Sequence, residues 1–116
     1  MRYWSRITRR LVAAAGLAAA IGLAGSASAA TLVVANKSEA TVSLVDIATR
    51  EIRATLAVGE GPHEVAVSPD GRLALVGIYG TRAAPGSSLA LIEIPAARVA
   101  RTIPLGEYRR PHGIVW

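Results

Sequence analysis

Cysteine is absent from this chain of 116 residues, which also has no phenylalanine and a single methionine. Without cysteine the protein has no disulfide bond, no thiolate metal site, no cysteine nucleophile and no haem attached through a Cys-x-x-Cys-His motif. A chain of this length forms at most one small domain. Because disulfides are excluded, its stability must come from a hydrophobic core or from partners.

A net excess of charge is also missing once the first ten residues are set aside. The whole chain has 13 basic and 8 acidic residues and a net charge of +5. Four of the arginines lie at the N-terminus: Arg2, Arg6, Arg9 and Arg10. From Ala30 onward the excess is about one positive charge, which is too small to hold a phosphate backbone. We therefore expect no nucleic-acid partner.

The N-terminal segment has the organisation of an export signal. Four arginines precede an apolar run from Leu11 to Gly25, and Ala27-Ser28-Ala29 supplies the small residues that signal peptidase requires. The apolar run is shorter than the roughly 20 residues that span a bilayer. We predict a signal helix within a signal peptide of residues 1–29, cleavage directed by Ala27 and Ala29, and a mature chain that begins near Ala30.

This prediction places the mature protein in the periplasm or outside the cell, with no stable membrane anchor after cleavage. The segment is typical of a Sec signal, and the Arg9-Arg10 pair is also compatible with twin-arginine export. An uncleaved N-terminal anchor is the alternative interpretation.

The rest of the chain has no sustained helical period. Short runs rich in Val, Ile, Leu and Thr alternate with turn residues, a pattern typical of repeated all-β architectures. The turn Ser68-Pro69-Asp70-Gly71 is the clearest, and Tyr79 to Ser87 is expected to form a longer loop. The predicted strands are residues 31–36, 41–47, 51–58, 64–67, 72–78, 88–94 and 98–105, with a last strand entered at 112.

An internal repeat organises these strands. Thr41–Ile47 aligns with Ser88–Ile94, 47 positions further along the chain. Pro62-His63 aligns with Pro111-His112. A unit of four strands that recurs every 40 to 50 residues has the spacing of propeller blades.

The first strand of each unit also aligns. Leu32-Val33-Val34 matches Leu73-Ala74-Leu75, 41 positions further along, and this alignment implies a six-residue insertion in the loop from 79 to 87. Strand 41–47 is apolar on both faces, as expected for sheets that are covered on both sides around a propeller axis.

These segments resemble a known family. Leu32–Asn36, with the Pro62–Gly71 element that contains Pro-His and Ser-Pro-Asp-Gly, is similar to the YVTN-type β-propeller repeat of exported bacterial (YncE-like) proteins. The Tyr-Val-Thr-Asn box of that repeat corresponds here to Val33–Asn36, with a degenerate second copy at Leu75–Ile78. The resemblance covers essentially all of the mature chain and implies a ring of about seven four-stranded antiparallel blades.

The expected fold is therefore all-β and contains an incomplete arc of about two propeller blades in residues 30–116. Residues 31–58 supply three strands of a first blade, 63–105 a second blade and 112–116 the start of a third. Such an arc leaves apolar faces open, so either the chain is an N-terminal fragment or several copies assemble into a homo-oligomer. We favour the fragment.

His63 and His112 hold the same repeat position, at the mouth of the channel that the resemblance implies. With Glu64 beside one of them, two imidazoles on adjacent blades suit a metal ion or an anion. The alternative is that Pro-His is a structural element of the repeat. Recurrence favours that alternative, because catalytic residues rarely recur in every repeat.

A second group of candidate ligand-binding residues is Tyr108, Arg109 and Arg110. Paired arginines beside a tyrosine suit a phosphate or carboxylate ligand, although such pairs also occur on solvated rims. The sequence predicts no catalytic residue, no cofactor and no metal ligand set.

We favour an exported propeller module that binds or scaffolds an unknown small molecule or protein, without independent activity in this form. The alternative is a lactonase-like propeller hydrolase acting on a sugar lactone, because lactonase-type propellers share the Pro-His and Ser-Pro-Asp-Gly elements. The binding interpretation predicts stabilisation by a ligand, whereas the lactonase interpretation predicts ring opening.

Overall fold

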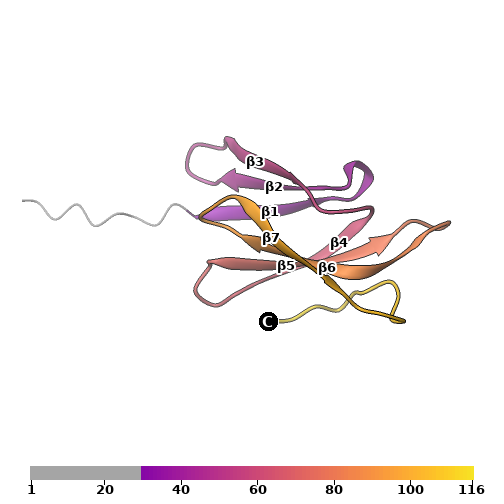
Figure 1. The fold of residues 1–116 in the computed structure, drawn as a ribbon. Coiled ribbons are helices and arrows are strands. Elements are labelled where there is room, and N and C mark those ends of the chain that lie inside the picture. Colours follow the sequence, from indigo (N-terminus) through magenta and orange to yellow (C-terminus); the bar gives the residue numbers. More distant parts are fainter. Residues whose placement is uncertain (1–29) are drawn as a thin grey trace, which may run out of the picture.

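The computed structural model describes residues 30–116, and this part of the chain is all-β (Figure 1). Seven strands form two antiparallel sheets, of three and four strands, and one turn of 3-10 helix is the only helical element within residues 30–116. The predicted signal helix and its cleavage residues Ala27 and Ala29 lie outside the described residues. No helix in the described part has the length and hydrophobicity that a membrane crossing requires.

The three-stranded sheet has the order β1-β2-β3. Its strands are β1 (Thr31–Asn36), β2 (Thr41–Asp46) and β3 (Ile52–Ala57), and the 3-10 turn η1 (Lys37–Glu39) connects the first two. The β2–β3 turn is closed by Asp46, whose carboxylate accepts hydrogen bonds from the backbone N–H groups of Ala48 and Thr49 at 2.8 and 2.9 Å. Asp46 therefore stabilises a turn, a role for which aspartate is well suited because its side chain bonds to backbone two or three residues further on.

The four-stranded sheet has the order β4-β5-β6-β7. Its strands are β4 (Pro62–Val67), β5 (Leu73–Gly80), β6 (Pro85–Glu93) and β7 (Arg98–Pro104). The predicted turn at Ser68 joins β4 to β5. The buried Ser68 hydroxyl donates to Asp70 Oδ1 at 2.6 Å and accepts the Leu73 N–H at 2.9 Å.

The two sheets lie one over the other, and the core is formed between them (Figure 1). Val42 and Leu44 of β2 are fully buried against the facing side of the four-stranded sheet, where Val76 and Ile92 are also fully buried. The Arg53 guanidinium adds a polar link by donating to the Ile94 carbonyl. Burial of this kind contributes roughly 25 cal/mol per Å² of apolar surface, so the sheet-to-sheet contact is the main source of stability.

The two sheets repeat the same backbone irregularities. The β2–β3 ladder shifts register between Leu44 and Val45, and the β6–β7 ladder shifts between Leu91 and Ile92, 47 positions further along. Positive φ angles recur in the same way, with 63° at Arg50 and 50° at Ala97. A bulge and a left-handed residue at matching places show that β2–β3 and β6–β7 are equivalent units. The internal repeat is therefore present in the structure.

The register corrects one part of the sequence alignment. Thr31 pairs with Asp46 in the first sheet and Leu73 pairs with the equivalent Glu93 in the second. Thr31 is therefore equivalent to Leu73, 42 positions further along, and the match of Leu32 with Leu73 was wrong by one residue. Because side chains alternate along a strand, that slip would place each apolar residue of the strand on the opposite face. The inserted segment is correspondingly one residue shorter than expected.

The loop expected from Tyr79 to Ser87 is also shorter. Strand β5 continues to Gly80, β6 begins at Pro85, and these two residues pair across the hairpin. Glycine and proline predict a loop from local preferences, but here the hairpin arms are prolonged by neighbouring backbone: Gly80 N–H donates to the Glu60 carbonyl at 3.0 Å. Only residues 81–84 lie outside the strands.

The strand expected at 112–116 is not formed in the described structure. No neighbouring strand among residues 30–116 is placed to pair with it, and a strand requires a partner for its backbone hydrogen bonds. This C-terminal segment instead runs along the face of the four-stranded sheet that points away from β1–β3 (Figure 1). It packs on Gly77, where an added Cβ would lie 2.9 Å from the Pro111 carbonyl oxygen and 3.0 Å from Ile114 Cδ1.

Candidate functional site

The two histidines of the repeated Pro-His pairs contact the same aromatic ring. The His63 and Tyr79 ring centroids are 5.0 Å apart with a tilt of 53°. The Tyr79 and His112 centroids are 6.1 Å apart, with the rings nearly perpendicular. Both imidazoles are exposed. The structure therefore brings the repeat-equivalent histidines together around a tyrosine that the sequence did not single out.

Two cationic side chains lie over the same tyrosine. The Lys37 ammonium and the Arg110 guanidinium carbon are each 5.1 Å from the Tyr79 ring centroid. Contacts of this length are cation–π interactions, worth about 0.5–1 kcal/mol each at exposed sites. Tyr79 is half-buried, so its ring forms a fixed platform for side chains that would otherwise be free to move.

Backbone contacts of the β5–β6 hairpin hold this arrangement in place. The Tyr79 N–H donates to the Gly61 carbonyl at 3.0 Å, and the Arg110 N–H donates to the Gly86 carbonyl at 2.8 Å. The Arg110 guanidinium also donates to the Arg82 carbonyl at 3.3 Å. Gly61 has φ of +66°, and a Cβ there would collide with the Gly80 backbone, so the close approach of the two segments requires glycine.

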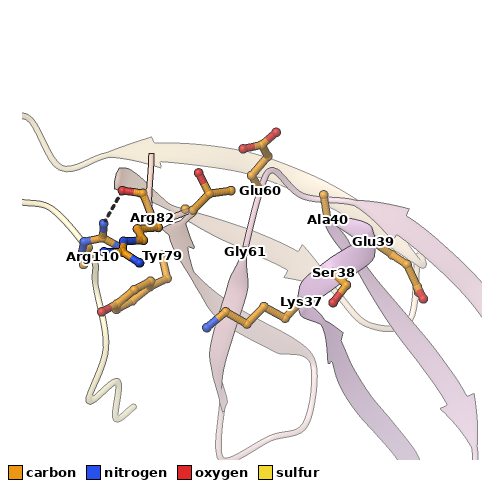
Figure 2. Close-up of a pocket in the computed structure, with 11 residues that line it drawn as sticks. Lys37, Ser38, Glu39, Ala40, Glu60, Gly61, Tyr79, Arg82 and Arg110 are labelled. Carbon is orange, nitrogen blue, oxygen red and sulfur yellow. Dashed lines mark hydrogen bonds between the residues drawn. The ribbon is translucent and has the colours of Figure 1, made fainter. Parts of the chain in front are cut away.

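A cleft of about 660 Å³ opens beside the ring. In Figure 2 the Lys37 and Arg110 side chains point toward Tyr79, whereas the carboxylates of Glu39 and Glu60 point away from it. The lining residues come from η1, from the segment before β4, from the β5–β6 hairpin and from the C-terminal segment: Lys37, Ser38, Glu39, Ala40, Glu60, Gly61, Tyr79, Gly80, Thr81, Arg82 and Arg110. The cleft therefore lies where the two sheets and the C-terminal segment meet.

Glu64 has a structural contact at the edge of this site. Its carboxylate accepts hydrogen bonds from the backbone N–H groups of Gly113 and of Ile114, the latter at 3.1 Å. The Ile114 bond is the largest cause that lowers the pKa of Glu64 below its ordinary value, and the nearby His63 and His112 lower it further. Glu64 is thus held as a carboxylate that fastens the C-terminal segment to β4.

The second predicted group is only partly assembled. Tyr108 is 80% exposed. Arg109 donates to the Gly106 carbonyl at 3.1 Å, within its own turn. Arg110 alone reaches the cleft. Adjacent residues in an extended loop point in different directions, which is why the Tyr-Arg-Arg run does not form one binding surface.

Sequence reasoning missed Lys37 and Tyr79. Asn36 and Ile78 are equivalent in the corrected alignment, so Lys37 and Tyr79 each follow the same repeat position. The signal was present, because the match of Val33–Asn36 with Leu75–Ile78 already places the first strands 42 residues apart and makes Lys37 equivalent to Tyr79. The one-residue slip and the assignment of Tyr79 to a loop obscured it.

The chemistry available here is that of binding. Exposed imidazoles, a lysine, an arginine and a phenol offer hydrogen-bond donors and positive charge. Within residues 30–116 no group of three His, Cys, Asp or Glu side chains is placed to hold a metal ion.

No protein-family model and no curated protein matches the chain. Among solved structures the chain is similar to hydrazine synthase of Kuenenia stuttgartiensis, with 27% sequence identity and a TM-score of 0.56. The match covers 67% of this chain and 21% of that chain. The matched part of this chain therefore corresponds to about a fifth of the hydrazine synthase chain.

Proposed function

We propose that this protein is an exported β-propeller module of the YVTN-repeat type that binds a small ligand in the cleft beside Tyr79. The observation that supports it most is the gathering of repeat-equivalent residues around the Tyr79 ring: His63 and His112 contact it, and Lys37, the repeat equivalent of Tyr79, lies over it and lines the cleft. Arrays of equivalent units present the same positions side by side, and ligands bind where such positions converge.

The propeller part of the proposal is supported by the repeated bulges and by the packing of the two sheets face to face. Export is supported by the composition of residues 1–29. The likeness to hydrazine synthase extends over 21% of that chain, so it supports the arrangement of the sheets and does not transfer an activity.

Ligand-dependent stabilisation tests the binding function. The full chain is heated in the presence of a panel that contains carboxylates, phosphates, sugars, sugar lactones and amines, and its Tm is recorded. We expect at least one class to raise the Tm, because a ligand that binds only the folded state stabilises it by mass action. A panel in which no class raises the Tm would overturn the proposal. Ring opening of a lactone would support the hydrolase instead.

A further inference from the structure

We propose that the cleft takes a small organic anion, and that Lys37 and Arg110 bind its carboxylate or phosphate group above the Tyr79 ring. This inference rests on the proposed binding function and names the ligand class. It differs from the two sequence expectations, in which an anion was bound by His63 and His112 or by Tyr108, Arg109 and Arg110.

The first support is uncompensated positive charge. Within residues 30–116 the structure contains one ion pair, between Arg98 and Glu93 at 2.7 Å. Lys37 and Arg110 therefore have no carboxylate partner in the described part of the chain, although both line the cleft. The nearby acidic side chains, Glu39 and Glu60, point away from the ring in Figure 2. An unpaired lysine and arginine at one cleft attract a negatively charged group.

The second support is preorganisation. Both cationic groups are 5.1 Å from the same ring centroid, so the two charges are at most twice that distance apart. A ligand bound beside the ring is therefore close to both charges. Arg110 is further fixed by its bonds to Arg82 and Gly86, which leave most of its guanidinium donors available. Side chains held before binding lose little conformational entropy when the ligand arrives.

The third support is the shape and composition of the cleft. Its volume of about 660 Å³ is that of small-molecule sites, which cover roughly 300–1,000 Å³. The Tyr79 ring provides an apolar surface beside the cations, and the exposed imidazoles of His63 and His112 border that ring. A ligand with a charged group and an organic body therefore fits better than a bare ion.

The test is an NMR titration of the isotope-labelled full chain with two probes, inorganic phosphate and citrate, at constant ionic strength maintained with chloride. We expect saturable amide shifts at Gly61, Tyr79, Gly80 and Thr81 with at least one probe. The two probes distinguish phosphate from carboxylate as the preferred group. Absence of a saturable shift with both probes overturns the inference.

Variants establish which side chains act. Lys37→Ala and Arg110→Ala should each weaken binding by about tenfold or more, because a hydrogen bond to a charged group is lost. Arg101→Ala removes the same charge from an exposed position outside the cleft and should leave the affinity unchanged. An equal loss in Arg101→Ala would mean that general charge attraction is measured, and would overturn the site.

The two proposals fail in different ways. If neutral sugars or amines raise the Tm and shift the same amides while both anions leave them unmoved, the binding function stands and the anion inference is wrong. Tyr79→Leu provides a further measurement, since it removes the ring under both cations but keeps an apolar side chain on β5. We expect this substitution to weaken the binding of citrate and to leave the chemical-shift dispersion of the core amide resonances unchanged.

Discussion

Glu64 joins two equivalent points of the repeat. Its carboxylate accepts the Gly113 N–H, and Gly113 is the residue that the Pro-His alignment matches with Glu64 itself. One unit thus holds the backbone of the next at the corresponding position. Such a bond is charge-assisted and stronger than a neutral one. The sequence predicts Glu64 as a ligand-binding residue. In the structure its carboxylate holds the backbone of the C-terminal segment.

The contact between Glu64 and the C-terminal segment should depend on pH. Hydrogen bonds to the carboxylate lower the pKa of Glu64 from its ordinary value of 4.5, so the contact contributes fully above pH 4.5 and is lost as the pH falls through the lowered pKa. We expect the Gly113 and Ile114 amide resonances to move together in that acidic range. Glu64→Gln should abolish the transition, and a midpoint above 4.5 in the original chain would contradict it.

Among the elements, strand β2 has one side in the core between the sheets and one side turned away from it. Val42 and Leu44 are fully buried between the sheets, whereas Val45 on the opposite side of the strand is only partly buried and Ile47 just beyond it is 54% exposed. The alternation follows from the two-residue period of a strand. Leu44 and Val45, although adjacent, therefore differ in how much apolar surface they bury in the core.

We expect Leu44→Ala to lower the free energy of unfolding by about 2–5 kcal/mol, because it opens a cavity in the core. Val45→Ala, on the partly exposed face, should cost about 1 kcal/mol or less. Urea denaturation of the full chain measures both. Equal losses at the two positions would indicate that the outer face is buried as deeply as the inner one.

The elements also show what local sequence can predict. β1 has the expected bounds and β2, β3 and β7 end within one residue of them, since the runs of β-branched residues and the turn residues between them are local signals. The β5–β6 hairpin differs because its arms depend on contacts with Glu60 and Gly61, which are distant in sequence. Arg110 and the histidines were predicted at the site. Tyr79 was not, because its role depends on that hairpin.

At the scale of the molecule, the outer face of the three-stranded sheet is apolar. On the three-stranded sheet, Leu32, Ile47 and Ile52 are 51%, 54% and 64% exposed. In the repeat alignment, Ile47 is equivalent to Ile94, which is buried against the first sheet. The exposed face of the three-stranded sheet is thus equivalent to the face of the four-stranded sheet that is buried in the core. Exposed apolar patches of this kind mark contact surfaces.

We therefore expect the full chain to self-associate in a concentration-dependent manner, measured by light scattering after size exclusion. Ile47→Glu combined with Ile52→Glu should reduce the association, because it places charge on the face that needs cover. Ala83→Glu combined with Ala96→Glu adds the same charge in exposed turns and should have no such effect. A chain that remains monomeric at high concentration would contradict this expectation.

The β5–β6 hairpin bears on how this protein can evolve. Residues 81–84 form a tip that lies beyond the buried strands, yet Thr81 and Arg82 of this tip line the cleft. Substitutions there would alter what the cleft accepts at little cost to folding. Selectivity and stability can thus evolve separately, with the repeated sheets conserved as a frame and the hairpin tip free to diversify.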